Sequence, residues 1–132
     1  MILVDSNILI DILSEDHGWR AWSEQALERA AENDEVAINP IIYAEVSVAF
    51  QRAEEFEAQL SATALRRLPL PYEAGFAAGK AFLEYRRRGG ARRSPLPDFY
   101  IGAHAALKGM TLLTRDRARY ASYFPRLALI AP

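Results

Sequence analysis

A short, uninterrupted apolar run at the start of the chain, followed at once by an acid, constrains the fold most strongly. Ile2 to Val4 has no polar alternation, which is typical of a strand buried on both faces in a parallel sheet. Asp5 follows where that strand ends, and Ser6 is predicted to cap a helix with an apolar face over 8–13. An acid at the carboxyl end of a central parallel strand lies in the crevice where open α/β sheets bind ligands. These two residues alone are equally consistent with simple helix capping.

Short apolar runs alternate with helical patterns along the rest of the chain. Further strands are predicted at 35–38, 110–113 and 127–130, and the first of these is followed by Asn39-Pro40, which starts a helix. Residues 66–71 are predicted to be a short, proline-limited edge strand or turn. Helices are predicted at 18–32, 41–51, 53–64, 72–88 and 96–108, with a helix of one or two turns after Asp116. Gly75 and Gly79 are predicted to admit a close helix, and Gly109 to end one. This alternation predicts a doubly wound α/β fold with helices on both faces of a parallel sheet.

Composition bounds the class of protein. A chain of 132 residues predicts one domain over 1–132, and its 51% hydrophobic and 25% charged residues are ordinary for a soluble globular protein. The absence of cysteine excludes disulfides and a Cys nucleophile, and it fits a reducing compartment. No signal peptide is visible, and no apolar run approaches the roughly 20 residues needed to cross a bilayer. We therefore expect a cytoplasmic protein with no membrane partner.

The charge is distributed unevenly. Residues 1–79 hold 5 Lys and Arg against 14 Asp and Glu, a charge of −9, whereas residues 80–132 hold 11 against 3, a charge of +8, which together give the net −1. A cluster of five arginines surrounds Gly89-Gly90, namely Arg86, Arg87, Arg88, Arg92 and Arg93. The cluster could be a solvated helix end, but we favour an arm that contacts phosphates, because such contacts dominate nucleic-acid affinity. Arg115 and Arg117 flank Asp116 and could touch the same backbone.

Four acids from separate segments are predicted to converge. Asp5 and Asp116 both follow buried strands, so a parallel sheet places them at the same edge, while Asp98 lies in the first turn of its helix and Glu45 one turn into another. Each acid alone has a structural explanation, such as capping or a favourable helix dipole. Together they form the oxygen-rich site that Mg²⁺ or a similar hard cation requires. No histidine is needed for this chemistry, and His104 is expected to be packed or solvated.

The chain resembles the PIN-domain ribonucleases, and it closely resembles the toxin half of VapBC toxin–antitoxin pairs. The matching stretches are Val4-Asp5-Ser6-Asn7-Ile8-Leu9-Ile10, Tyr43-Ala44-Glu45-Val46, Pro97-Asp98-Phe99-Tyr100-Ile101-Gly102-Ala103-His104-Ala105, Leu112-Leu113-Thr114-Arg115-Asp116 and the tail from Arg119 to Pro132. Any one stretch is a weak signal, whereas four acids in order with these neighbours over almost the whole chain form a strong one.

The resemblance implies a PIN-like three-layer α/β/α sandwich around a central, mostly parallel five-stranded sheet. It also implies RNA cleavage that depends on Mg²⁺ or Mn²⁺, in which an activated water attacks the phosphodiester bond. It places four residues at the metal, Asp5, Glu45, Asp98 and Asp116. Asn7 and Thr114 match positions that orient these acids or a water, and Ser6 stands where the family often has Thr.

The resemblance further implies a cognate antitoxin, with a DNA-binding part and a tail that wraps the toxin, and a possible homodimer. Gly75, Gly79, Trp19 and Trp22 are candidates for the groove that the tail occupies, with core packing as the alternative. Three other interpretations remain open at this stage. They are a PIN-like RNA-processing nuclease outside toxin–antitoxin systems, a non-catalytic RNA-binding module, and a phospho-acceptor receiver domain, which would require a Lys where this chain has Thr114-Arg115-Asp116.

Overall fold

The structure is a computed structural model that describes residues 1–14, 18–90 and 95–132. Its strands are β1 (Ile2–Val4), β2 (Val36–Ile38), β3 (Arg66–Arg67), β4 (Thr111–Leu113) and β5 (Leu129–Ile130). Its helices are α1 (Ser6–Leu13), α2 (Arg20–Asn33), α3 (Pro40–Ser47), α4 (Ala53–Ser61), α5 (Tyr72–Arg87), α6 (Leu96–Leu107) and α7 (Arg117–Tyr123). None of the helices in these ranges is long and apolar enough to cross a membrane.

The five strands form one sheet in the order β3-β2-β1-β4-β5, and every neighbouring pair is parallel. Leu3 on the central strand β1 pairs with Ala37 on one side and Leu112 on the other. All three residues are fully buried. The uninterrupted apolar run of β1 is therefore covered on both faces, as its sequence predicts.

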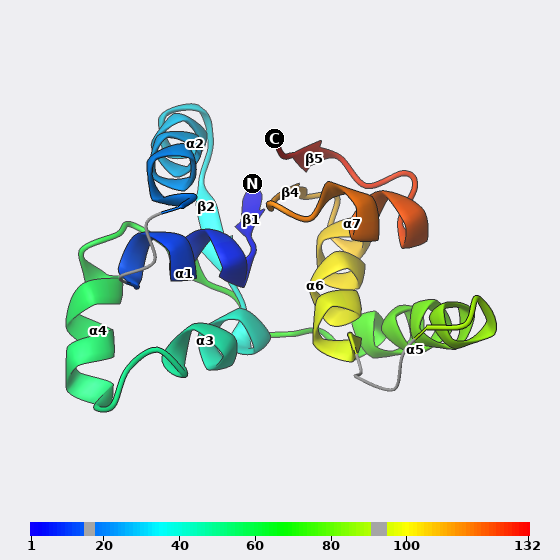
Figure 1. Cartoon of the computed structure of the whole chain (residues 1–132). Coiled ribbons are helices and arrows are strands. Elements are labelled where there is room, and N and C mark those ends of the chain that lie inside the picture. Colours follow the sequence, from blue (N-terminus) through cyan, green and yellow to red (C-terminus); the bar gives the residue numbers. More distant parts are fainter. Residues whose placement is uncertain (15–17, 91–94) are drawn as a thin grey trace.

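Helices cover both faces of this sheet. Figure 1 shows α1 to α4 on one side and α5 to α7 on the other, which makes a three-layer α/β/α sandwich. The chain first adds strands in one direction from β1 and then returns to the other side of β1, and right-handed crossovers put the two sets of helices on opposite faces. The order therefore reverses between β1 and β4, and the crevice at their carboxyl ends is the expected ligand-binding place.

Small residues pack helices α5 and α6 against each other in the layer formed by α5 to α7. α5 and α6 pack through a cluster of Ala74, Ala78, Ala81, Phe99 and Ala103. A Cβ added to Gly75 would lie 3.3 Å from the Tyr100 hydroxyl, so this glycine does admit a close neighbour, whereas Gly79 has nothing within 4 Å and the prediction is wrong there. Gly109, with φ +65°, follows α6 and ends it as predicted.

Local structure differs from the prediction in one helix cap, in the lengths of two strands and at the end of one helix. Asp5, not Ser6, is the N-cap of α1, because its Oδ1 accepts from the Ser6 backbone N at 2.7 Å, and Ser6 becomes the first helical residue. The segment 66–71, predicted as an edge strand or turn, and the predicted strand 127–130 each contain only two strand residues. The first of these shortens where Pro69 and Pro71 lack the N–H that a ladder needs. The helix predicted over 41–51 ends at Ser47.

Two glycines inside helices give a matched test of the packing between α6 and α7. A Cβ on Gly102 would lie 2.6 Å from Phe124 Cε2 and 3.1 Å from Tyr120 Cδ1. We predict that Gly102→Ala destabilises the protein by about 1–2 kcal/mol, since overpacking outweighs the better helix propensity of alanine. Gly79→Ala, in open space, should stabilise it by about 0.5–1 kcal/mol. Urea unfolding followed by circular dichroism would measure both, and equal effects would contradict this packing.

Candidate active site

Asp5 is the most buried of the four predicted acids, with only 2% of its surface exposed. Its Oδ2 accepts hydrogen bonds from the Thr114 hydroxyl at 2.7 Å, the Tyr120 hydroxyl at 3.1 Å and the Asn7 amide at 3.2 Å. Its Oδ1 accepts from the backbone N of Ser6 at 2.7 Å. Burial raises the pKa of this carboxyl above its ordinary value, and these hydroxyls and the Ser6 backbone N–H partly oppose that rise. The network fixes the carboxylate at the end of β1.

Thr114 and Asn7 connect the end of β4 to this carboxylate. The Thr114 oxygen accepts from the backbone N of Asp116 at 3.0 Å and lies 3.3 Å from the Asn7 amide nitrogen. The side-chain Oδ1 of Asn7 in turn accepts a hydrogen bond from the backbone N of Arg115 at 3.2 Å. Both predicted orienting residues therefore hold Asp5 and also shape the turn that carries Asp116.

Glu45 approaches Asp5 from α3, through the Ser6 hydroxyl in the first turn of α1. Its Oε1 accepts from the Ser6 hydroxyl at 2.9 Å, and the same hydroxyl lies 3.4 Å from Asp5 Oδ1. Burial raises the pKa of Glu45, the Ser6 hydrogen bond lowers it, and the charge of Asp5 raises it further. The hydroxyl of Ser6 thus lies between two acids instead of capping the helix.

The charges of the other three predicted acids all act on Asp98. Burial, followed by the charges of Asp5 and Glu45, raises the pKa of Asp98 to about 7, with a smaller rise from Asp116 and a partial reduction from Arg119. The four carboxylates therefore act on one another at the switch point of the sheet. We call these four residues, Asp5, Glu45, Asp98 and Asp116, the acid pocket.

Arg119 joins the two more exposed acids. Its Nε lies 3.4 Å from Asp98 Oδ2 and 3.3 Å from Asp116 Oδ2. Asp116 also caps α7, because its Oδ1 accepts from the Arg119 backbone N at 3.2 Å. Sequence reasoning did not single out Arg119 or Tyr120 for the site. Their positions three and four residues after Asp116, one helical turn away, are the signal that could have suggested them.

The remaining predicted residues lie around this centre. Arg115 Nε and Nη2 donate to buried Asp11 at 2.6 and 2.9 Å, so the guanidinium is held against α1. Arg86, Arg87 and Arg88 are exposed at the end of α5. Arg88 pairs with Glu84 at 3.1 Å and lies over the Tyr123 ring at 4.7 Å. Arg92 and Arg93, also predicted, lie outside the described residues.

Two further predictions concern a histidine and a tryptophan pair. His104 is 1% exposed and its Nδ1 lies 3.0 Å from the Asn39 amide nitrogen, so it is packed as expected and away from the chemistry. Trp19 and Trp22 meet edge to face with ring centroids 6.0 Å apart, and the Arg115 guanidinium lies 5.2 Å from the Trp19 ring centre. Trp19 remains 43% exposed.

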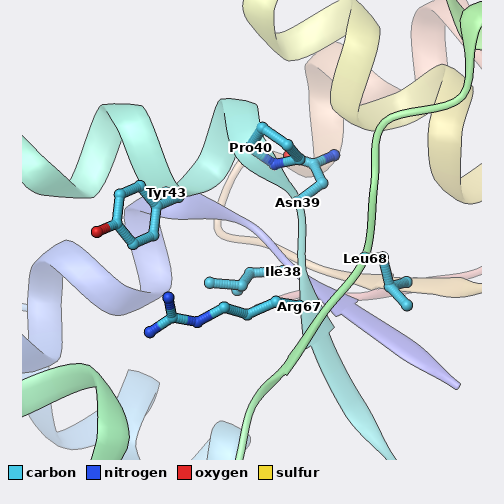
Figure 2. Close-up of a pocket in the computed structure, with 6 residues that line it drawn as sticks. All are labelled: Ile38, Asn39, Pro40, Tyr43, Arg67 and Leu68. Carbon is cyan, nitrogen blue, oxygen red and sulfur yellow. The ribbon is translucent and has the colours of Figure 1, made fainter. Parts of the chain in front are cut away.

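A hollow on the surface lies beside α3 and contains none of the acids. It has a volume of about 270 Å³ and is lined by Ile38, Asn39, Pro40, Tyr43, Arg67 and Leu68. Figure 2 shows these side chains coming from the end of β2, the start of α3 and the β3 segment. Arg67 lies over the Tyr43 ring at 5.3 Å, and both side chains bind Glu57. The hollow is therefore walled by a structural ion pair, and the acid pocket is a separate feature.

The donor set of the acid pocket fits a hard divalent cation, because all its ligands are carboxylate oxygens and their mutual repulsion calls for positive charge. Among residues 1–14, 18–90 and 95–132, however, no group of three or more His, Cys, Asp or Glu side chains is arranged to hold a metal ion. Asp98 and Asp116 are turned toward Arg119 instead. Metal ligation by these acids stays a prediction that the chemistry of the site supports.

The protein is an α/β sandwich with an all-parallel sheet and four clustered acids at its switch point, and sequence comparison identifies the family. Residues 2–125 match the PIN domain family, and the chain belongs to it. No curated protein matches the chain. The resemblance drawn from the acids and their neighbours is thereby confirmed at the level of the family.

Solved structures with the same fold come from toxin–antitoxin complexes. VapBC2 from Rickettsia felis, bound to a DNA fragment from its promoter, is 22% identical with a TM-score of 0.75, over 100% of this chain and 99% of that one. A toxin–antitoxin complex from Klebsiella pneumoniae is 25% identical with a TM-score of 0.73, over 98% and 96%. VapBC-1 from nontypeable Haemophilus influenzae is 20% identical with a TM-score of 0.71, over 99% and 98%.

The raised pKa of Asp98 predicts how stability depends on pH. The pKa is about 7 in the folded protein and about 3.9 in an unfolded chain, so the folded state binds this proton more tightly and loses stability as the pH rises from about 4 through 7. We predict that Asp98→Asn, with metal removed by EDTA, is more stable than wild type by about 1–2 kcal/mol at pH 8. This is less than the full shift would give, because the side chain is 32% exposed.

Urea unfolding at pH 5 and pH 8 would measure this difference. The gain from Asp98→Asn should shrink toward pH 5, where the wild-type carboxyl is already protonated when folded. Glu28→Gln, at an exposed position of α2, is the control and should change the free energy of unfolding by less than about 0.5 kcal/mol. A gain that is the same at both pH values, or a loss at pH 8, would count against the repulsion within the acid pocket.

Proposed function

We propose that this protein is a metal-dependent endoribonuclease and the toxin of a type II toxin–antitoxin pair. The observation that carries the proposal is the acid pocket, in which the charges of Asp5, Glu45 and Asp116 all act on Asp98 at the switch point of the sheet. Clustered carboxylates with perturbed pKa values in a crevice are typical of functional sites. Membership of the PIN domain family also supports the proposed nuclease function.

Each residue of the acid pocket and its neighbours has a proposed role in metal binding or positioning, and their contacts support these roles. Asp5 and Asp98 would be the main ligands of one Mg²⁺ or Mn²⁺ ion, with Glu45 and Asp116 completing the site. When bound, the ion would activate a water for attack on phosphorus and neutralise the phosphate charge. Asp5 is held in place by the Thr114 and Tyr120 hydroxyls, so it is preorganised. Asn7 positions the Thr114 turn that carries Asp116.

The basic surface supports RNA as the substrate. The arginines at the end of α5 lie in the same layer as α6, which carries Asp98, and as α7, which carries Arg119 (Figure 1). A strand of RNA whose scissile phosphate lies at the acid pocket could extend toward Arg86, Arg87 and Arg88. These cations would offset the repulsion between the RNA backbone and the acids.

The partner part of the proposal rests on similarity of fold. The solved structures with TM-scores above 0.7 are of toxins in complex with antitoxins, which favours a cognate antitoxin for this chain. A second function, RNA processing by a PIN nuclease without an antitoxin, uses the same acid pocket and differs only in its cellular context.

Cleavage is the first test of the chemistry. Purified wild-type protein with Mg²⁺ or Mn²⁺ should cleave total RNA into fragments with defined ends, and Asp98→Asn should reduce the rate about 100-fold or more, because a charged ligand is lost while the shape is kept. Asp34→Asn, an exposed acid paired with the N-terminus, is the matched control and should cleave at the wild-type rate. Full activity of Asp98→Asn in excess Mg²⁺ would refute the site.

Growth tests the biological context. Expression of the wild type alone should arrest growth, Asp98→Asn should abolish the arrest, and co-expression of a small gene adjacent to that for this chain should restore growth. Harmless expression of a folded, cleaving wild-type protein would favour the RNA-processing function. Arrest that persists with Asp98→Asn would count against nuclease action as its cause.

The arginines at the end of α5 are tested by salt dependence. We predict that replacing Arg86, Arg87 and Arg88 with Gln in the Asp98→Asn background weakens binding to single-stranded RNA and lowers the salt slope by about 0.7 per lost phosphate contact. Fluorescence anisotropy over a range of KCl concentrations would measure this. Arg20, Arg29 and Arg52, replaced together on the opposite layer, remove the same charge and should leave the slope unchanged. An unchanged slope in the first variant would mean that the three arginines are only a solvated helix end.

A further inference from the structure

Arg119 places a positive charge inside the acid pocket. Its Nε lies 3.4 Å from Asp98 Oδ2, on α6, and 3.3 Å from Asp116 Oδ2, at the start of α7. It therefore bridges two acids that come from different elements. Its side chain is 29% exposed, so this charge is partly shielded from water.

The guanidinium of Arg119 is held less firmly than that of Arg115 nearby. Arg115 reaches Asp11 through two short hydrogen bonds of 2.6 and 2.9 Å, which is the bidentate geometry of a fixed pair. The contacts of Arg119 are longer, at 3.3 and 3.4 Å, and both use the single Nε. Its Nη1 is buried and makes no hydrogen bond with the described residues. A buried donor without a partner is costly, so this arrangement is one that a better-matched cation could replace.

We propose that Arg119 is a tethered cation that competes with the divalent metal for Asp98 and Asp116, so that the metal must displace its guanidinium to enter the acid pocket. This inference rests on the proposed function, since it concerns the same metal. Carboxylate oxygens turned toward a guanidinium are not free to ligate an ion. The competition accounts for the finding that the described residues present four coupled acids and yet no ready group of three ligands.

The ring of Tyr85 is a second binding position for the displaced guanidinium of Arg119. Its Cζ already lies 5.8 Å from the centre of the Tyr85 ring on α5, within the range of a cation–π contact. α5, α6 and α7 lie together in one layer (Figure 1). Arg119 can therefore leave the carboxylates and keep its ring contact, which makes the exchange a change of side-chain position and not of fold.

Binding of Mn²⁺ alone to the purified full chain tests the proposal without depending on activity. Isothermal titration calorimetry would compare wild type with Arg119→Gln, Arg119→Lys and Arg117→Gln. Arg117 is the matched control, because it is on the same helix, carries the same charge and points to the Ala131 carbonyl oxygen at 3.0 Å. We expect Arg119→Gln to bind Mn²⁺ at least tenfold more tightly than wild type, Arg117→Gln to stay within twofold, and Arg119→Lys to remain close to wild type.

Two results would overturn the proposal directly. Equal or weaker binding by Arg119→Gln, or an equal gain in Arg117→Gln, would mean that Arg119 does not compete at the site. If wild type binds no Mn²⁺ in the millimolar range, binding that appears in Arg119→Gln would support the proposal and its absence would overturn it. RNA cleavage by the wild type in excess Mg²⁺ is measured separately, so the proposed nuclease function can stand while this inference fails.

Discussion

The buried carboxylate of Asp5 is the interaction on which the rest of the site depends. A charge with 2% exposure is tolerated only when it is well paired or hydrogen-bonded, and here the Ser6 backbone, the Thr114 and Tyr120 hydroxyls and the Asn7 amide supply the bonds. These groups belong to α1, the end of β4 and α7. The carboxylate therefore joins the ends of two central strands to the last helix. Stability and site geometry are set by the same atoms.

The cost of this arrangement is repulsion that hydrogen bonds alone do not relieve. Glu45 shares the Ser6 hydroxyl with Asp5, and Asp98 is pushed to a pKa of about 7 by its acidic neighbours. A protein that maximised stability alone would not collect these acids in one crevice. Such local conflict is expected at functional sites, where a ligand supplies the missing charge. Arg119 is the cation that the chain itself offers at this place.

Much of the fold follows from the sequence because buried parallel strands are apolar on both faces. The run from Ile2 to Val4 could be placed at the centre of a sheet without further information, and Asp5 could then be placed at its end. The placement of Asp5 and Asp116 at one edge also followed, since carboxyl ends of parallel strands meet there. The family resemblance contributed the remaining roles, including those of Asn7 and Thr114.

Tertiary contacts decide what the sequence could not show. Ser6 has the composition of a cap, but Asp5 caps α1 and frees the Ser6 hydroxyl for Glu45. Arg115 looked available to RNA, yet buried Asp11 binds its guanidinium. Gly79 shares the spacing of a close-packing glycine with Gly75 but faces open space, because only the latter meets Tyr100. Each of these outcomes depends on which face of a helix meets its neighbour, and that is not encoded in the local pattern.

We propose that the acid pocket binds a divalent cation directly. A crystal of the wild type soaked in Mn²⁺ would test it, because manganese gives an anomalous signal that locates the ion independently of the protein. We predict an anomalous peak in direct contact with the carboxylates of Asp5 and Asp98, at the switch point between β1 and β4, with Arg119 turned toward Tyr85. A well-ordered crystal with no peak at this site, or with manganese bound only elsewhere, would contradict the account.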